Sequence, residues 1–419
     1  MRELTVFLKQ LHIKNFKSYI NQTVDFERVS VIVGANASGK SNFIDALRFI
    51  NNIVIYGIND AISLSGGIEY LLNSLVGKSE PICFRFVMET DNNIEYEIER
   101  TFQLELVKIV YDFEIKAHKK GTGFNIIKDQ LIATYEIFDS TKKKNKHKSI
   151  DVYYEKTTSG KIKQKISKEC ELSQNEKQRI TLYSFMDFVN RTPEKKELVL
   201  HKIAYFIFYQ FRIYDLIKIY DFDSKLLKLS SAISTKMELD EDGSNIALVL
   251  QKIIKNKSQR HKLINLLSDA LPFVEDVNVK ANYDKSIFYT IKENYSHKDF
   301  RANFLSDGTV NIIAIIIALY FEIEAGIVIL EEPERNLHPK LMAKIIDMAK
   351  ETSTNRQIII TTHTPELVKC IDMESVLYVE RDTQGYSMIK RPSDSETIKM
   401  FLNNEIGMDD LFIQDMLGV

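Results

Sequence analysis

Residues 34–41 have the spacing of a phosphate-binding loop. They read Gly-Ala-Asn-Ala-Ser-Gly-Lys-Ser and fit the pattern G-x-x-x-x-G-K-[ST] in full. The glycines let backbone N–H groups curve around a β-phosphate, and Lys40 adds a cation over the β- and γ-oxygens. The Ser41 hydroxyl would hold Mg²⁺. The pattern predicts a nucleoside triphosphate site formed by Gly34, Asn36, Ala37, Ser38, Gly39, Lys40, Ser41 and Asn42.

A second candidate site follows the apolar run at residues 327–330, which ends in Glu331 and Glu332. Acids commonly terminate buried strands, so the pattern alone is weak. Beside a phosphate-binding loop it gains meaning, because α/β folds bind ligands at the carboxyl edge of a parallel sheet. Glu331 would then reach Mg²⁺ through water, and Glu332 would take the proton from an attacking water.

A third candidate is His363, which ends the apolar strand predicted at residues 357–361 and stands beside Thr362 and Thr364. A lone histidine is usually structural. A strand of the same sheet carries the two acids, however, so we expect His363 to contact the γ-phosphate or the attacking water.

A fourth candidate is the stretch at residues 305–309, directly before a long apolar helix. Ser306 is a good N-cap, so helix initiation alone would explain it. The same geometry, with free N–H groups, a hydroxyl and a helix dipole, makes an anion site at Ser306 and Gly308. This site cannot easily serve a phosphate already held by the loop of the same subunit. It therefore implies a second subunit.

The elements around these residues predict an α/β fold. A β-branched strand at residues 29–33 leads into the loop, and residues 40–51 form an amphipathic helix. Strand-like segments at residues 11–13 and 23–26 resemble a hairpin edge. The last part alternates helix and strand: helix 309–324, strand 327–330, helix 339–352, strand 357–361, helix 365–370 and strand 376–379. Such alternation predicts a parallel sheet covered by helices.

The middle of the chain has other patterns. Residues 82–106 and 130–154 look antiparallel, with hairpin tips expected at residues 91–93 and around the lysine-rich residues 142–148. Residues 173–229 show a helical and aromatic period, which favours a core or a subunit interface over base stacking. Helices at 244–257 and 262–270 and strands at 274–279 and 286–291 follow. The final residues, 393–419, read as short helices.

Composition limits the class of protein. The 419 residues are 44% hydrophobic and 27% charged, which is enough apolar material for a full hydrophobic core. The formal charge of −2 excludes a globally basic protein that coats nucleic acid. Three distant cysteines, Cys83, Cys170 and Cys370, argue against a disulfide framework and a cysteine zinc site. The longest apolar run, residues 312–321, is too short to span a bilayer and predicts a buried helix. With no signal-like N-terminus, we expect a cytoplasmic protein.

The four motifs, in this order, resemble those of the ABC-type ATPases of the RecF, SMC and OLD group, in particular bacterial stand-alone OLD-like ATP-binding proteins. Residues 11–19 and 242–247 resemble two further stretches of that group. The resemblance implies a P-loop head with a mixed sheet, an antiparallel β lobe and a helical insertion. It implies ATP and Mg²⁺ as ligands, with two nucleotides sandwiched between the loop of one subunit and the Ser306–Gly308 signature of the other.

Departures from the family pattern are few. Asp307 replaces the first glycine of the transporter signature, and Glu331 stands where many ABC proteins have Asp. No Gln occurs between Ser41 and Gln103, which leaves the Q-loop unplaced. We expect residues 1–110 and 236–390 to form the two halves of the head. Residues 111–235 would form a β-rich and then helical insertion for oligomer or partner contacts, and 391–419 a helical tail.

The biological role of the predicted ATPase is less specifically indicated by the sequence than its ATPase activity. OLD nucleases carry a C-terminal Toprim domain with metal-binding acids, and no such cluster is visible after Val379. The leading hypothesis is an ATPase that controls a separately encoded nuclease or toxin in anti-phage defence. The alternatives are a RecF-like DNA-binding protein of replication or repair and a nucleotide-binding scaffold with little turnover. A DNA contact would have to be local or borrowed from a partner. The lack of membrane segments weakens the case for a role in transport.

Overall fold

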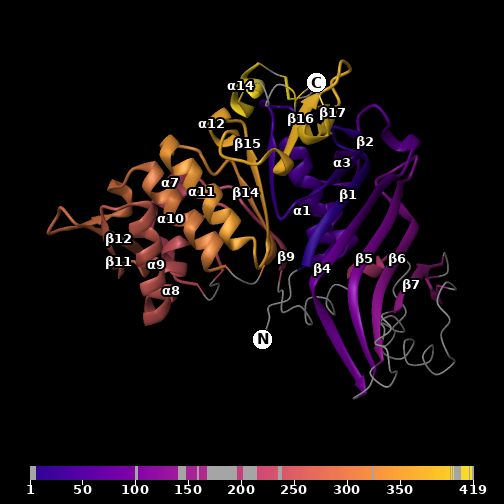
Figure 1. Ribbon diagram of the computed structural model, residues 1–419, viewed down its shortest axis with the longest axis horizontal. Coiled ribbons are helices and arrows are strands. Elements are labelled where there is room, and N and C mark those ends of the chain that lie inside the picture. Colours follow the sequence, from indigo (N-terminus) through magenta and orange to yellow (C-terminus); the bar gives the residue numbers. More distant parts are fainter. Residues whose placement is uncertain are drawn as a thin grey trace.

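The computed structural model describes residues 6–99, 102–139, 148–157, 160–167, 196–201, 215–234, 238–322, 325–396, 398, 400, 407–414 and 416–417. It is elongated, with a central sheet between a broad antiparallel sheet and a mostly helical lobe (Figure 1). The predicted α/β class, with mixed and antiparallel sheets, is confirmed.

The central sheet has six strands in the order β17-β16-β3-β15-β14-β9. Their bounds are β3 (Val29–Val33), β9 (Asp215–Tyr220), β14 (Ala325–Glu331), β15 (Gln357–Thr362), β16 (Val376–Arg381) and β17 (Ser387–Lys390). Five strands are parallel, and β17 at one edge is antiparallel to β16. The predicted parallel sheet is therefore present, and β3 is buried at all five residues, as a strand covered on both faces requires.

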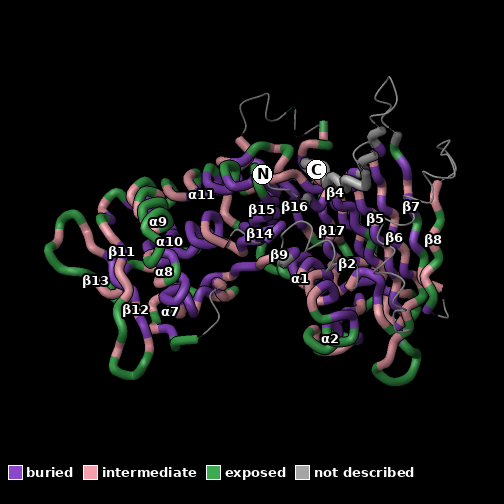
Figure 2. The backbone as a smooth tube through the Cα atoms, turned by 90° about the horizontal axis from the view of Figure 1, so that it is seen from below, coloured by how far each residue is buried: buried purple, intermediate pink, exposed green. Residues whose placement is uncertain are grey.

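Two hydrophobic cores lie on opposite faces of this sheet. Val31 and Val33 belong to one core and Ile32 to the other, because successive side chains of a strand point to opposite faces. The Ile32 core includes α1 (Lys40–Tyr56) and the antiparallel sheet. The Val31 core includes α10 (Asp307–Tyr320) and α11 (Pro339–Thr352). The predicted buried helix is α10, whose buried course is visible in Figure 2.

The antiparallel sheet has seven strands in the order β2-β1-β4-β5-β6-β7-β8. They are β1 (Val6–Phe16), β2 (Tyr19–Asp25), β4 (Ile82–Glu99), β5 (Phe102–Ala117), β6 (Phe124–Asp139), β7 (Lys148–Lys156) and β8 (Ile162–Ile166). The predicted hairpin edge is confirmed as β1–β2. The predicted tip at residues 91–93 is wrong: β4 runs through them, with a shift in register against β5 between Glu89 and Ile94.

The helical lobe combines α7 (Ser224–Leu227), α8 (Ile246–Lys255) and α9 (Lys257–Ala270) with a small antiparallel sheet. That sheet contains β10 (Ser231–Ala232), β11 (Val274–Ala281), β12 (Ser286–Glu293) and β13 (Asp299–Arg301). Beside α1 lie α2 (Ile58–Leu64) and α3 (Ile68–Leu71), and α12 (Pro365–Val368) packs on α14 (Met408–Ile413) near the C-terminal end. Helices α8, α9 and α12 and strands β11 and β12 match the predicted pattern, whereas α2, α3, β10 and β13 were not predicted.

One prediction for the middle segment fails. Residues 215–220, inside the range predicted to be helical, form β9 at an edge of the central sheet. The aromatic residues of that range from Phe185 to Phe211 lie outside the described residues, as does most of the lysine-rich tip. Since β5 crosses residue 110 and β9 precedes residue 235, the sheets do not follow the expected domain ranges, and the domain division stays a prediction. Of the helices that the structure describes, none is long and apolar enough to cross a membrane.

Candidate nucleotide site

The register of the central sheet brings three of the four predicted motifs to one edge. Val33 pairs with Thr362, and Thr361 pairs with Glu331 across the next strand. The loop therefore begins at Gly34, the acids end β14 and His363 follows β15 along the same row. The carboxyl ends of adjacent parallel strands are where α/β folds bind ligands, so the juxtaposition predicted from sequence is present.

The loop at residues 34–41 has a backbone suited to anions. Ala37 and Gly39 have positive φ angles of 63° and 123°. The helix α1 begins at Lys40, and its N-cap Gly39 has no side chain to occupy the first N–H groups. Uncapped N–H groups at the positive end of a 17-residue helix attract a phosphate.

Lys40 is buried beneath the loop, with 7% of its surface exposed. Its Nζ donates to the carbonyl oxygens of Gly34 at 2.7 Å and Ala35 at 3.1 Å. Burial lowers the pKa of Lys40, and the charges of Glu332 and Glu334 oppose that effect. Lys40 and these two carboxylates are therefore close enough to interact electrostatically.

The other predicted loop residues have different surroundings. Asn36, Ala37 and Ser41 are exposed to solvent, where a ligand could reach them. Ser38 is buried. The amide of Asn42 donates to Ser18 Oγ at 2.9 Å. The roles of these residues in binding stay predictions.

Glu332 stands at a tight turn after β14. Its φ of 43° is unusual for a residue with a side chain, and its N–H donates to the Thr361 carbonyl at 3.0 Å. The carboxylate accepts a hydrogen bond from Arg335 Nε at 2.9 Å and lies 3.2 Å from His363 Nδ1. Burial opposes ionisation, but Arg335 and His363 outweigh it and hold the pKa of Glu332 below its usual range. Glu332 is therefore an ionised carboxylate that could accept a proton.

Glu331 has a different electrostatic environment. Burial, together with Asp221 and other nearby acids, raises the pKa of Glu331 to about 7 although Arg48 lies 3.6 Å away. A divalent cation would relieve this crowding of negative charge, so the residues fit Mg²⁺. Among the described residues no set of three ligating side chains stands ready for a metal. Proteins commonly hold Mg²⁺ through one or two carboxylates together with substrate phosphates.

His363 is half-exposed, and the residues on either side of it are fixed to the acidic turn. Glu334, with 4% exposure, accepts hydrogen bonds from Thr362 Oγ1 at 2.5 Å and Thr364 Oγ1 at 3.1 Å. The segment that carries His363 is thus tied to the turn that carries Glu332. A change at either one would be transmitted to the other.

The fourth motif lies elsewhere in the fold. Ser306 is the N-cap of α10, and its Oγ accepts from the Thr309 N–H at 3.1 Å. Asp307 is paired with Lys228, and that lysine holds the pKa of Asp307 below its usual range. In both views α10 lies beyond β14 and β15 from α1 (Figures 1 and 2). Among the described residues, the contacts of Ser306, Asp307 and Gly308 are with Thr309, Lys228 and Asn336 rather than with the loop.

Gly308 also has a local reason to be glycine. A Cβ there would lie 2.7 Å from the Asn336 carbonyl oxygen. Nearby, Asn311 Nδ2 donates to the Arg335 carbonyl at 2.8 Å. The start of α10 therefore packs directly on the turn that follows Glu332.

Several site residues escaped sequence analysis. Arg335 binds Glu332 and also Asp221, at 2.6 Å, and Arg48 binds Glu241 through both of its terminal nitrogens. Asp221 follows β9 as Glu331 ends β14. Residues 216–220, which are apolar except for Lys218, are followed by an acid as in β14, and that signal could have revealed Asp221.

Comparison with known proteins gives a family match over most of the chain. Residues 29–369 match a family model described as "AAA domain, putative AbiEii toxin, Type IV TA system". This range includes all four motifs.

Individual relatives match shorter stretches. The chain is 24% identical over 155 residues to the Septu protein PtuA of Bacillus thuringiensis, covering 32% of the chain and 39% of that protein. It is 25% identical over 175 residues to the retron Ec83 probable ATPase of Escherichia coli, covering 37% of the chain and 32% of the relative. The chain thus spans less than two fifths of these curated relatives. A solved Smc head bound to the C-terminal winged-helix domain of ScpA covers 92% of this chain and 97% of its own, with 14% identity and a TM-score of 0.48.

Proposed function

This chain belongs to the family described as "AAA domain, putative AbiEii toxin, Type IV TA system", and we propose that it binds and hydrolyses ATP. It would dimerise around the nucleotide and control a separately encoded effector. The observation that carries the proposal is the meeting of Lys40, Glu332 and His363 at one sheet edge. The relatives from Septu and retron systems support the defence setting.

ATP would bind through its phosphates to the loop. The N–H groups of residues 36–41 would surround the β-phosphate, and Lys40 would leave its carbonyl partners to contact the β- and γ-oxygens. Ser41 and Glu331 would hold Mg²⁺, which supplies positive charge that neutralises the phosphates when bound. The Lys40 ammonium would leave the Gly34 carbonyl only when a phosphate is present to replace it, so the loop would change its contacts on binding.

Hydrolysis would use the carboxylate and the histidine. Glu332, ionised and fixed by Arg335, would accept the proton of the attacking water at its carboxylate. His363 would orient that water or the γ-phosphate from the opposite side of the same carboxylate. Because Glu334 fixes the strand end before His363, both groups would keep their spacing as the nucleotide enters.

The signature would act on the nucleotide of a second copy. Ser306 and the start of α10 would form an anion site for the nucleotide of a second copy, so a homodimer would complete two sites at once. The start of α10 packs on the turn after Glu332, and binding in trans would therefore reach the base directly.

The central test is Glu332→Gln. We expect turnover to fall by about 10²- to 10⁴-fold, the usual contribution of a general base, and a stable dimer to accumulate with ATP. Light scattering after gel filtration measures the dimer, and phosphate release measures turnover. Glu275→Gln, an exposed glutamate of β11 paired with Lys292, is the matched control and should behave as wild type. Wild-type turnover in Glu332→Gln would instead favour a nucleotide-binding scaffold.

Control of an effector needs a separate test. A pull-down with the product of the neighbouring gene should recover it with ATP and lose it with Lys40→Ala. If this chain alone protects cells from phage, the two-component idea fails. If the protein instead binds DNA in an ATP-dependent and steeply salt-dependent way, the RecF-like alternative is supported.

A further inference from the structure

The carbonyl oxygens of the loop accept hydrogen bonds from an organised set of donors. Lys40 Nζ donates to the carbonyls of Gly34 and Ala35, and the Tyr19 hydroxyl donates to the Gly39 carbonyl at 3.1 Å. Two further donors come from the far end of the chain. Arg381 Nε donates to the Ala37 carbonyl at 2.6 Å, and Ser387 Oγ donates to the Ser38 carbonyl at 2.6 Å.

This pattern matters for anion binding because a peptide unit has two poles. When a carbonyl has a fixed partner outside the loop, its peptide plane cannot turn, and the adjoining N–H keeps its direction. The N–H of Ser38 points into the loop, where it donates to the Ala35 carbonyl at 3.2 Å. Arg381 and Ser387 hold the carbonyls of Ala37 and Ser38, which are the two peptide units just before the Gly39–Lys40 turn. These two side chains therefore fix the part of the loop that would face the β-phosphate.

The donors lie on one hairpin, formed by β16 and β17, in which Arg381 is paired with Ser387 across the strands. The hairpin lies so close to the loop that only glycine fits. A Cβ on Gly34 would meet the Val379 carbonyl oxygen at 2.3 Å, and one on Gly39 would meet Ser387 Oγ at 2.1 Å. The spacing of the loop glycines is thus partly explained by a partner about 350 residues away in sequence.

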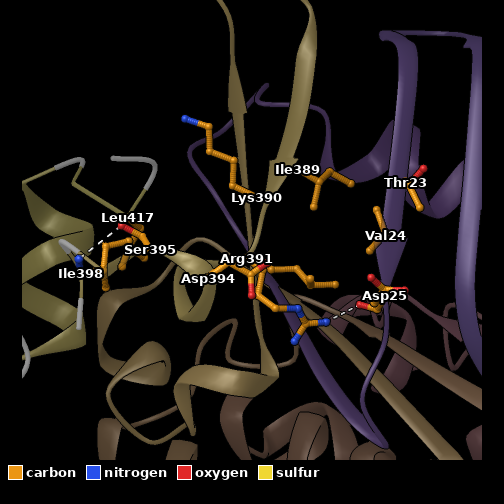
Figure 3. A pocket seen from close by; sticks show the side chains of 11 residues that line it. Thr23, Val24, Asp25, Ile389, Lys390, Arg391, Asp394, Ser395, Ile398 and Leu417 are labelled. Carbon is orange, nitrogen blue, oxygen red and sulfur yellow. Dashed lines mark hydrogen bonds between the residues drawn. The ribbon is translucent and has the colours of Figure 1, made fainter.

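The hairpin is itself anchored at several points. Ser387 N–H donates to the Ser18 carbonyl at 3.1 Å, which attaches the hairpin to the turn between β1 and β2. At its other end Arg391 donates to the Asp25 carbonyl at 2.5 Å, across a cavity of about 460 Å³ (Figure 3). Gln22 donates to the Ile389 carbonyl at 2.9 Å. A hairpin held at both ends can hold the loop.

Arg381 is exposed, and its guanidinium is used on backbone carbonyls. Nε donates to Ala37, and a terminal nitrogen donates to Gly385 at 2.9 Å. Within the described part of the chain it has no carboxylate partner. A full positive charge therefore stands beside the loop without an acid to neutralise it, which favours an anion there.

We propose that Arg381 and Ser387 are positioning residues of the nucleotide site, which hold the loop in its phosphate-binding conformation before a nucleoside triphosphate arrives. This inference rests on the proposed function. It adds a third segment, the β16–β17 hairpin, to a site that the motifs locate in the loop and at the ends of β14 and β15.

The test compares Arg381→Ala, Arg381→Lys and Ser387→Ala in the full chain, with a fluorescent ATP analogue for affinity and phosphate release for turnover. Arg381→Ala should weaken binding and raise KM by about 10- to 100-fold, since it removes a charge-assisted hydrogen bond and a nearby cation. At saturating ATP, kcat should stay within about 3-fold because Glu332 and His363 are untouched. Arg381→Lys should recover part of the affinity, and Ser387→Ala should weaken binding by about 5- to 10-fold.

Lys390→Ala is the matched control, because Lys390 lies on β17 but pairs with Glu380 at 2.8 Å and its side chain points away from Arg391 in Figure 3. It should bind as wild type. Equal affinity in Arg381→Ala, Ser387→Ala and wild type would overturn the proposal, as would an equal loss in Lys390→Ala. Wild-type protein that binds the analogue but never hydrolyses ATP would overturn the proposed function alone, since the affinity comparison still judges the hairpin.

Discussion

Replacing Asp129 with asparagine should change how stability depends on pH. Asp129 lies on β6, is 2% exposed, and accepts hydrogen bonds from the Tyr111 hydroxyl at 2.5 Å and from the Val199 N–H at 3.0 Å. Leu200 N–H donates to the same tyrosine at 3.2 Å. His201, the next residue, contacts the Val54 carbonyl of α1 at 3.0 Å. The carboxyl thus holds the segment that links the antiparallel sheet to the helix of the loop.

The magnitude follows from burial. Burial raises the pKa of Asp129 from its usual 3.8 to about 6, against the hydrogen bonds from Tyr111 and Val199. Between these two pH values the folded protein keeps a proton that the unfolded chain has released. Stability therefore falls as pH rises from about 4 to 6 and is constant above that. At 1.36 kcal/mol per pH unit, the loss is about 3 kcal/mol.

Asparagine is neutral throughout, so the variant lacks this loss. Relative to wild type, the free energy of unfolding of Asp129→Asn should rise by about 2 kcal/mol between pH 4 and pH 7, whatever constant offset the substitution adds. Urea titrations followed by tyrosine fluorescence at paired pH values measure this difference. The comparison variant is Asp112→Asn, which replaces a carboxylate of β5 that pairs with Lys128 at 2.6 Å. A difference between Asp129→Asn and wild type that stays constant to within about 0.5 kcal/mol would refute the reasoning.

Three further predictions address the site. Glu334→Ala should lower kcat by about 10- to 100-fold in a steady-state assay, because it frees the segment that carries His363; an unchanged kcat would contradict this. Lys228→Ala should weaken the ATP-driven dimer by about 2- to 5-fold in sedimentation, because Asp307 then stands unpaired at an anion site. Adding Asp307→Asn should restore it, and a double variant as weak as the single one would argue against the charge effect. Gly308→Ala should destabilise the fold by about 1–3 kcal/mol in thermal unfolding, and unchanged melting would show that the turn after β14 yields freely.

The strands that sequence predicted best are those that the sheet buries on both faces. A strand such as β3 needs an almost unbroken run of β-branched residues. So short a run followed by a glycine loop favours a strand over a helix. The strand β9 was missed because it lies at an edge, where Lys218 is tolerated and pairs with Glu238 at 2.6 Å. Lys218 interrupts the apolar pattern of the sequence, but residues 215–220 still form a strand.

Long-range pairing also overrides local turn signals. Asp-Asn-Asn at residues 91–93 is a favourable turn composition, yet β4 continues through it and absorbs the irregularity as a shift in register against β5. The strand pairs before and after the shift outweigh the local preference. Turn chemistry therefore predicted a hairpin where the chain has a bulge.

For the site, sequence predicted the types of residue but not their partners. Glycine, lysine and acid spacings follow from what phosphate and water require, so they could be found in a single chain. The donors that hold the loop cannot be found in this way. Arg381 and Ala37 are 344 residues apart, and no period or local motif links them until the sheet places β16 beside β3.

The two predicted anion sites differ in how ready they are. At the loop, the carbonyls of Gly34, Ala37, Ser38 and Gly39 have side-chain partners, and the helix behind them has no side-chain cap, so N–H groups remain for a ligand. At the signature, the Ser306 hydroxyl already caps the Thr309 N–H. An anion there must compete with that cap and with the nearby Asp307 carboxylate. The loop should therefore take the nucleotide first, and the signature of a second copy should close on it afterwards.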